Sequence, residues 1–214
     1  MLFNDRSDAG KQLVSLLLKY KDQPDTLVLG LARGGVVTAA DIAVGLRLPL
    51  DVIVVRKIGA PGNEELAIGA IAERGEGIFN DELVKLLRVS ADYIKKEVTK
   101  QKAILRERLQ RYRSNAPALS VKNKTVILVD DGIATGASMR VAIASVREGN
   151  AKTIVLAVPV AAPDSLSKIA DDVDEIVCLF APSFFEAVGS FYRAFDQTTD
   201  EEVISLLLHR HRKS

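Results

Sequence analysis

Residues 126–139 read Val-Ile-Leu-Val-Asp-Asp-Gly-Ile-Ala-Thr-Gly-Ala-Ser-Met, and this stretch decides the fold. Its four leading apolar residues predict a buried strand, two aspartates end that strand, and a loop of small residues leads into a helix. Backbone N–H groups at the start of a helix bind anions, so residues 134–138 predict a phosphate-binding turn. Several charge-assisted hydrogen bonds, at roughly 1.5–3 kcal/mol each, would outweigh the helix dipole at about 0.3–1 kcal/mol.

The two aspartates of this stretch, Asp130 and Asp131, stand beside a site that attracts negative charge. Carboxylates repel a phosphate, so a hydroxyl-rich group is expected between them and the phosphate. The 2′- and 3′-hydroxyls of a ribose fit, with the 5′-phosphate of the same sugar in the loop. Both side chains can face one crevice because the chain turns here. The alternative is that one aspartate caps the following helix.

The rest of the chain repeats the order strand, helix, strand. This order predicts an α/β fold with a doubly wound, mostly parallel sheet. Short apolar runs rich in β-branched residues predict five buried strands, with a further short strand at 66–72. The five strands are Thr26–Leu31, Asp51–Val55, Thr125–Val129, Thr153–Val160 and Glu175–Phe180, and the helices between them are Val36–Leu46, Ser138–Glu148 and Pro163–Asp172.

The stretch 126–139 resembles the ribose-5-phosphate signature of type I phosphoribosyltransferases, which has a hydrophobic quartet, two acidic residues and a Thr-Gly loop. The resemblance implies that Asp130 and Asp131 are the catalytic carboxylates, which hold the ribose hydroxyls. It also implies a 5′-phosphate loop. Gly132, Ala137 and Ser138 depart from the common pattern, but all three are small. The loop residues are Ala134, Thr135, Gly136, Ala137 and Ser138.

A second loop follows the predicted strand 27–31 and reads Ala32, Arg33, Gly34 and Gly35. It is similar to the pyrophosphate loop of the same family, which implies a cis peptide at Ala32–Arg33. Its two glycines permit unusual backbone dihedrals. In a doubly wound sheet, loops after neighbouring strands meet where ligands bind, so the two loops are expected to hold opposite ends of one phosphoribosyl diphosphate.

Lys57, with Arg56 beside it, is expected to reach the diphosphate, and the glycine-rich loop 59–65 is expected to close over the site. The cofactor implied by the family is Mg2+, which is held through the diphosphate and by Asp130 or Asp131. No side chain is assigned as general acid or base.

Residues 81–113 interrupt the strand–helix order and are interpreted as a helical insertion within a single domain, 1–214. Ser90 is the expected N-cap of a helix of about 24 residues, with apolar residues at helical spacing. Its narrow apolar stripe predicts packing across the sheet edge or against a second subunit. A homodimer is therefore expected.

Composition and the absence of other motifs narrow the function further. Of the 214 residues, 48% are hydrophobic and 27% charged, which is typical of a globular protein. The single Cys178 suits a reducing, cytoplasmic location, and no run of residues is long and apolar enough for a membrane span. Neither Gly-x-x-x-x-Gly-Lys-Ser/Thr nor Gly-x-Gly-x-x-Gly occurs, which disfavours P-loop and dinucleotide-binding folds.

The favoured function is transfer of a phosphoribosyl group from 5-phosphoribosyl 1-diphosphate to a nitrogenous acceptor, a step of nucleotide metabolism. The nature of the acceptor stays open. Helix 95–113 carries eight Lys/Arg against two glutamates. The alternative function is therefore a regulator that senses the sugar diphosphate and binds nucleic acid, the less favoured partner, through this helix. Five aromatic residues are interpreted either as a hood over a planar base or as core: Phe184, Phe185, Phe191, Tyr192 and Phe195.

Overall fold

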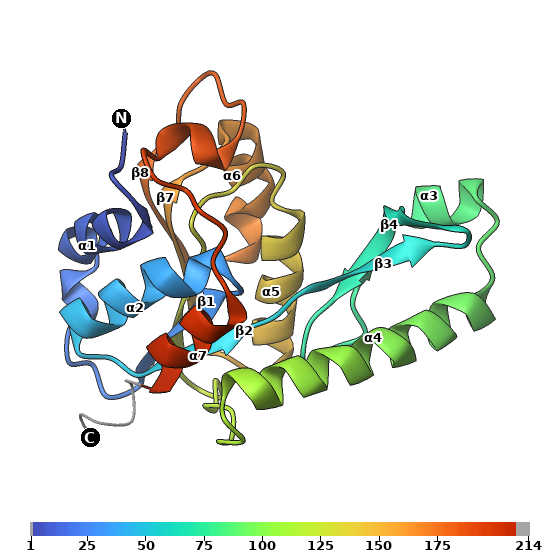
Figure 1. Cartoon of the computed structure of the whole chain (residues 1–214), viewed down its shortest axis with the longest axis horizontal. Coiled ribbons are helices and arrows are strands. Elements are labelled where there is room, and N and C mark those ends of the chain that lie inside the picture. The colour runs from blue at the N-terminus through green and yellow to red at the C-terminus, as the bar shows by residue number, and fades with distance from the viewer. Residues whose placement is uncertain (1, 209–214) are drawn as a thin grey trace.

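The computed structural model describes residues 2–208 and contains one five-stranded parallel sheet (Figure 1). The sheet has the order β2-β1-β6-β7-β8, which confirms the α/β fold with a mostly parallel sheet. In that order β1 lies between β2 and β6, so the chain reverses its direction of winding there. The strands are β1 (Thr26–Leu31), β2 (Leu50–Ile53), β6 (Thr125–Val129), β7 (Thr153–Val160) and β8 (Glu175–Phe180).

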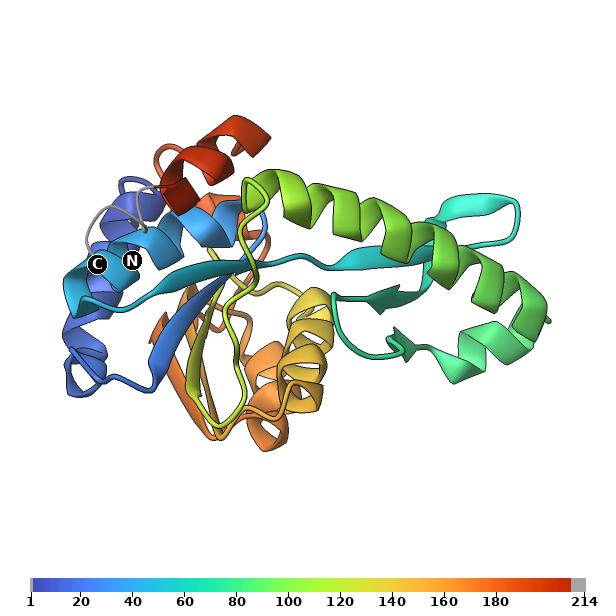
Figure 2. The ribbon, with the colours of Figure 1, turned by 90° about the horizontal axis from the view of Figure 1, so that it is seen from below.

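Helices cover both faces of this sheet (Figure 2). One face carries α1 (Arg6–Leu16), α2 (Gly34–Leu46) and α7 (Asp200–Leu208), and the other carries α5 (Ala137–Glu148) and α6 (Pro163–Ile169). Each face buries its own apolar cluster, because the strand residues are apolar on both sides. Three short 3-10 turns complete this body: η1 (Leu18–Tyr20), η2 (Ala170–Asp172) and η3 (Val188–Phe191).

An arm projects from the sheet beyond β2 (Figures 1 and 2). It contains an antiparallel sheet of the order β3-β4-β5. The strand expected at 66–72 is present within β4, but the loop expected at 59–65 is wrong. Those residues form a tight hairpin, in which only two residues separate β3 from β4. The arm consists of β3 (Arg56–Ala60), β4 (Asn63–Ile71), β5 (Ile78–Phe79), α3 (Asp81–Leu86) and α4 (Ala91–Tyr112).

Helix α4 joins the arm to the sheet body. Its N-cap is Ser90, as predicted, and it runs for 22 residues. The first half packs on the arm's own apolar cluster through Tyr93, Ile94 and Val98. The second half buries Leu105 and Leu109 in the main core. The apolar stripe of α4 is therefore covered within the chain, and these contacts require no second subunit; the homodimer stays a prediction.

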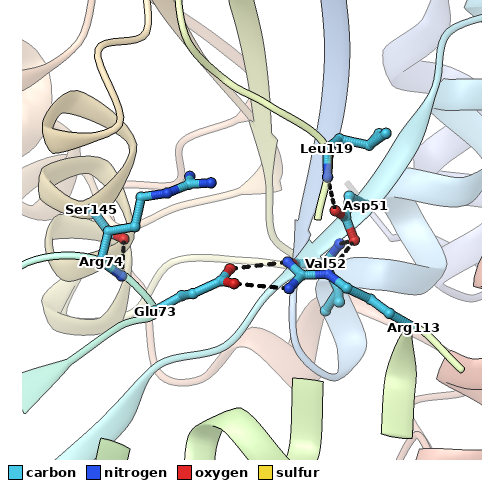
Figure 3. A network of polar contacts seen from close by, with 7 residues as sticks. All are labelled: Asp51, Val52, Glu73, Arg74, Arg113, Leu119 and Ser145. Atoms are coloured by element: carbon cyan, nitrogen blue, oxygen red, sulfur yellow. Dashed lines mark hydrogen bonds and ion pairs between the residues drawn. The ribbon is translucent and has the colours of Figure 1, made fainter. Parts of the chain in front are cut away.

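A buried ionic cluster lies at the root of the arm (Figure 3). Arg113 follows α4, and its guanidinium donates two hydrogen bonds to the carboxylate of Glu73, at 2.9 and 3.0 Å. It also donates to Asp51 Oδ1 at 3.1 Å and to the Val52 carbonyl at 3.2 Å. The second oxygen of Asp51 accepts the N–H of Leu119 at 2.9 Å. The segment after β4 and the segment after α4 are thus tied to β2 through Glu73, Arg113 and Asp51.

No helix within residues 2–208 has the length and apolarity needed to cross a membrane.

Candidate functional site

The two predicted loops lie side by side at the carboxyl edge of the sheet. Strands β1 and β6 pair in register up to Gly30 and Val129, so the segments that follow them start from adjacent positions. Residues 32–35 continue from β1 into α2, and Asp130 and Asp131 continue from β6. Ligands of doubly wound sheets bind at this position, outside the carboxyl ends of the strands, and we refer to this edge of the sheet as the crevice.

Gly34 and Gly35 contact the acidic pair directly. A Cβ at Gly34 would overlap Asp131 Oδ2, and a Cβ at Gly35 would lie 2.8 Å from Asp130 Cα. Neither glycine is among the positive-φ residues. The expectation that they supply unusual dihedrals is therefore wrong: glycine is required here because there is no room for a side chain between residues 34–35 and the acidic pair.

Asp130 and Asp131 differ in their surroundings. The pKa of Asp130 is raised well above its ordinary value, mainly by burial and next by the charge of Asp131. Both disfavour the ionised form of Asp130. Asp131 accepts a hydrogen bond from Arg6 Nε at 2.6 Å. The backbone of Asp131 is also held, because the Tyr192 hydroxyl donates to its carbonyl at 2.5 Å. Neither carboxylate caps a helix, so the alternative interpretation of the pair is wrong.

The predicted phosphate loop turns into α5 at Gly136, whose φ of 76° lies in the left-handed region that favours glycine. Four of its residues are exposed, while Gly136 is buried. The Ser165 hydroxyl of α6 donates to the Ala134 carbonyl at 2.5 Å, which ties the loop to α6. The exposed residues are Ala134, Thr135, Ala137 and Ser138.

The peptide bond Ala32–Arg33 is cis, as the resemblance implied. The Arg33 side chain, however, pairs with Asp200 of α7 at 3.5 Å, where Arg108 of α4 also pairs at 3.4 Å. The backbone of the loop, rather than the Arg33 guanidinium, is thus the part that faces the acidic pair.

Comparison with known proteins gives a consistent result. The model of the phosphoribosyl transferase domain family matches residues 8–196. The chain belongs to this family. Two Mycobacterium tuberculosis proteins, MT0597 and Rv0571c, are 42% identical to it over 211 residues and are named provisionally as phosphoribosyl transferases. The matched residues are 99% of this chain and 47% of each relative, so the chain spans about half the length of these curated relatives.

The crystal structure of TT1426 from Thermus thermophilus is 41% identical to this phosphoribosyl transferase domain, with a TM-score of 0.83. The superposition covers 98% of this chain and 99% of that one. The arm as well as the sheet body therefore belongs to a shared architecture.

Lys57 of the phosphoribosyl transferase domain follows β2, the strand that pairs with β1. It is exposed on β3 at the root of the arm. There it lines a cavity of about 290 Å³ together with Arg56, Glu64 and Glu97. Arg56 donates to Gln101 Oε1 of α4 at 2.5 Å. A role for Lys57 on the diphosphate stays a prediction.

The predicted aromatic hood is largely a packed cluster. Phe191 contacts Phe180 and Phe185 with ring centroids 5.9 and 5.2 Å apart, and Tyr192 stacks on Phe195 at 4.9 Å. Phe184, in contrast, is 80% exposed. Of the five aromatics, Phe184 thus keeps the most surface for stacking against a planar group.

Most of the basic helix is paired within the chain. Arg113 is buried with Asp51 and Glu73, and Lys102 Nζ donates to the Gly75 carbonyl at 2.8 Å. Arg108 and Arg111 pair with Asp200, and Lys100 with Glu64 and Glu97. Five of its eight cations therefore have acceptors in the same chain, which weakens the nucleic-acid alternative.

Arg6 is the site residue that sequence reasoning missed. The signal lies one residue earlier: the Asp5 side chain accepts the Asp8 N–H at 2.7 Å and caps α1. A helix that begins at Arg6 follows from this pattern. Its contact with Asp131, 125 residues away, does not.

A Gly34→Ala variant is expected to bind phosphoribosyl diphosphate at least about tenfold more weakly, because the new methyl group displaces Asp131; overpacking typically costs 1–3 kcal/mol. Isothermal titration calorimetry measures the change. The matched control is Gly45→Ala in the same helix, whose methyl group would meet the Val14 side chain, remote from the loops. Equal affinities for wild type and Gly34→Ala would contradict the placement of the sugar between the loops.

Proposed function

We propose that the protein transfers the phosphoribosyl group of 5-phosphoribosyl 1-diphosphate to a nitrogenous acceptor. In this reaction the bond between C1 of the ribose and the diphosphate oxygen breaks, a bond from C1 to the acceptor nitrogen forms, and pyrophosphate leaves with the electron pair. The acceptor nitrogen loses its proton to solvent or to pyrophosphate. Membership of the phosphoribosyl transferase family supports the class of reaction.

The direct contact of Gly34 with Asp131 carries this proposal. It brings the loop 32–35 against the acidic pair, and the exposed residues that follow this pair in the chain lead into the N-terminus of α5. A sugar with phosphoryl groups at both ends matches that order. The 5′-phosphate binds the N–H groups and hydroxyls of residues 134–138, the ribose hydroxyls donate to Asp130 and Asp131, and the diphosphate lies on the backbone of residues 32–35.

The acidic pair also suits the developing charge of the reaction. As the diphosphate leaves C1, positive charge grows on the sugar ring, and nearby carboxylates stabilise it. The Tyr192 hydroxyl holds the backbone of Asp131 through its carbonyl, which limits the movement of this residue during the step.

Mg2+ fits this site as a partner of the substrate. The described residues 2–208 contain no group of three or more His, Cys, Asp or Glu able to hold a metal alone. Magnesium is commonly bound through one or two carboxylates together with substrate phosphates. Asp130 and Asp131 supply that number, and the bound ion would neutralise the departing diphosphate. A cytoplasmic location stays a prediction from the single cysteine.

The test has a binding arm and a turnover arm. Calorimetry with phosphoribosyl diphosphate and Mg2+ is expected to show saturable binding that chelation of Mg2+ weakens. Pyrophosphate release is then measured with a panel of purines, pyrimidines and simple amines, and one acceptor class is expected to raise it above the rate without acceptor. The absence of sugar diphosphate binding would refute the proposal. Binding without release across the panel would refute transfer to these acceptors.

A further inference from the structure

Arg6 lies in the crevice but has no part in the function proposed so far. Its Nε donates to Asp131 Oδ2 at 2.6 Å, and its Nη1 donates to the Asp196 carbonyl at 2.7 Å. The guanidinium lies over the Phe195 ring, 3.8 Å from the centroid. Only 12% of the Arg6 side chain and 14% of the Asp131 side chain are exposed. Three contacts, from the acidic pair and from residues 195–196, therefore fix this cation in place.

The guanidinium also borders the other loop. A Cβ at Gly34 would lie 2.7 Å from Arg6 Nε. Arg6 Nε thus borders both Gly34 and the carboxylate of Asp131 at the point where these two meet. In the proposed function, a phosphoribosyl diphosphate that spans from residues 134–138 to residues 32–35 would carry its C1 carbon and first phosphoryl group past this point.

Binding of a ribose hydroxyl at the Asp131 Oδ2 site that Arg6 holds therefore requires an exchange. Asp131 Oδ2 cannot accept a ribose hydroxyl in the position that Arg6 Nε holds. When Arg6 gives up that oxygen it remains a buried cation, which is costly unless another anion pairs with it. The planar guanidinium matches phosphoryl oxygens in a two-pronged geometry, and the diphosphate is the adjacent anion. Stacking on Phe195 and the bond to Asp196 keep the guanidinium in the crevice during the exchange.

We propose that Arg6 is a substrate-binding residue that holds Asp131 until the ribose hydroxyls displace it and then binds the diphosphate. This inference rests on the proposed function. Arg6 lies outside residues 8–196, the part that matches the family model, so membership of the family does not supply this role. A sugar without a diphosphate must break the Arg6–Asp131 pair and gives the cation no new partner. Arg6 thereby favours the diphosphate form over a plain sugar phosphate.

The experiment compares two ligands on the same variants. Dissociation constants for phosphoribosyl diphosphate and for ribose 5-phosphate are measured by calorimetry on wild type, Arg6→Ala and Arg6→Lys. The control is Arg47→Ala, which removes a surface arginine paired with Asp22. In Arg6→Ala the diphosphate is expected to bind at least tenfold more weakly and ribose 5-phosphate at least threefold more tightly. Arg6→Lys keeps the charge without the planar fork. Its dissociation constants are expected to lie between those of wild type and Arg6→Ala.

Opposite changes for the two ligands separate this role from a structural one. A merely structural Arg6 would weaken both ligands by the same factor, and that result would overturn the proposal. Unchanged affinities in Arg6→Ala would also overturn it. If Arg6→Ala fails to fold, the ratio of the two constants in Arg6→Lys decides: a ratio shifted toward ribose 5-phosphate supports the role, and an unshifted ratio refutes it. Failure of wild type to bind either ligand would instead refute the proposed function.

Discussion

In the double variant Asp130→Asn/Asp131→Asn, affinity for phosphoribosyl diphosphate is expected to fall by about 100-fold or more. Hydrogen bonds to charged groups contribute roughly 1.5–3 kcal/mol each, and about 1.4 kcal/mol corresponds to a tenfold change in affinity. In the proposed binding mode, both ribose hydroxyls lose their carboxylate acceptors in this variant. Calorimetry measures the loss. The matched control is Asp171→Asn/Asp172→Asn, a second adjacent acidic pair that lies on the exposed turn η2 after α6.

The single variant Asp130→Asn separates binding from stability. Burial and the charge of Asp131 raise the pKa of Asp130 in the folded protein. A raised pKa means that the folded state binds this proton more tightly than the unfolded state does. Wild type therefore loses stability as the pH rises from the ordinary Asp pKa of about 3.9 through the raised folded value. Asparagine carries no such penalty.

Asp130→Asn is accordingly expected to be at least as stable as wild type at pH 7. This advantage should shrink as the pH falls below about 4, where Asp130 is protonated in both states. Thermal unfolding at several pH values provides the measurement. Weaker binding combined with lower stability at pH 7 would show that Asp130 supports the fold rather than the ligand.

Replacement of Arg113 by Met is expected to lower the free energy of unfolding by about 3–5 kcal/mol, because it leaves buried carboxylates without their cation. The side chains of Arg113 and Asp51 are only 7% and 1% exposed. Urea denaturation followed by circular dichroism gives the free energy. Arg47→Met breaks an exposed Arg–Asp pair of the same chemistry, with Asp22, and is expected to cost at most about 1 kcal/mol.

A double-mutant cycle with Glu73→Gln isolates the two-pronged pair from the rest of the cluster. If Arg113→Met costs no more than Arg47→Met, the cluster does not anchor the arm. If the arm only loses its position in the folded protein, the slope of the unfolding free energy against urea concentration should become smaller, because unfolding then exposes less surface.

The sheet and the placement of its loops were accessible from sequence because they depend on local signals. Uninterrupted β-branched runs identify strands buried on both faces, and residues that follow neighbouring parallel strands share one edge. The contact between Gly34 and Asp131 follows from those two facts and the pairing of β1 with β6. The reason for the glycines did not follow, because lack of space between two loops is a tertiary property.

The arm and Arg6 were harder to predict for different reasons. Residues 59–65 contain glycine and proline, which favour a loop, but the hairpin register places both strands on the apolar face of α4, and that packing overrides the local preference. Arg6 and Asp131 are far apart in sequence, and a single arginine near a helix start is typical of many solvated surfaces. Only the folded chain brings its charge into the crevice.

The division of α4 between two apolar clusters makes the domain modular. Its side chains up to Val98 belong to the arm, whereas those from Leu105 onward belong to the sheet body. A graft that joins a foreign hairpin-and-helix cassette within the stretch 99–104 and just after β2 would retain Arg113 and the loops 32–35 and 134–138, provided that the cassette supplies a carboxylate in place of Glu73. Protein engineers can thus vary the arm as one piece while Asp130, Asp131 and both loops keep their places in the sheet body.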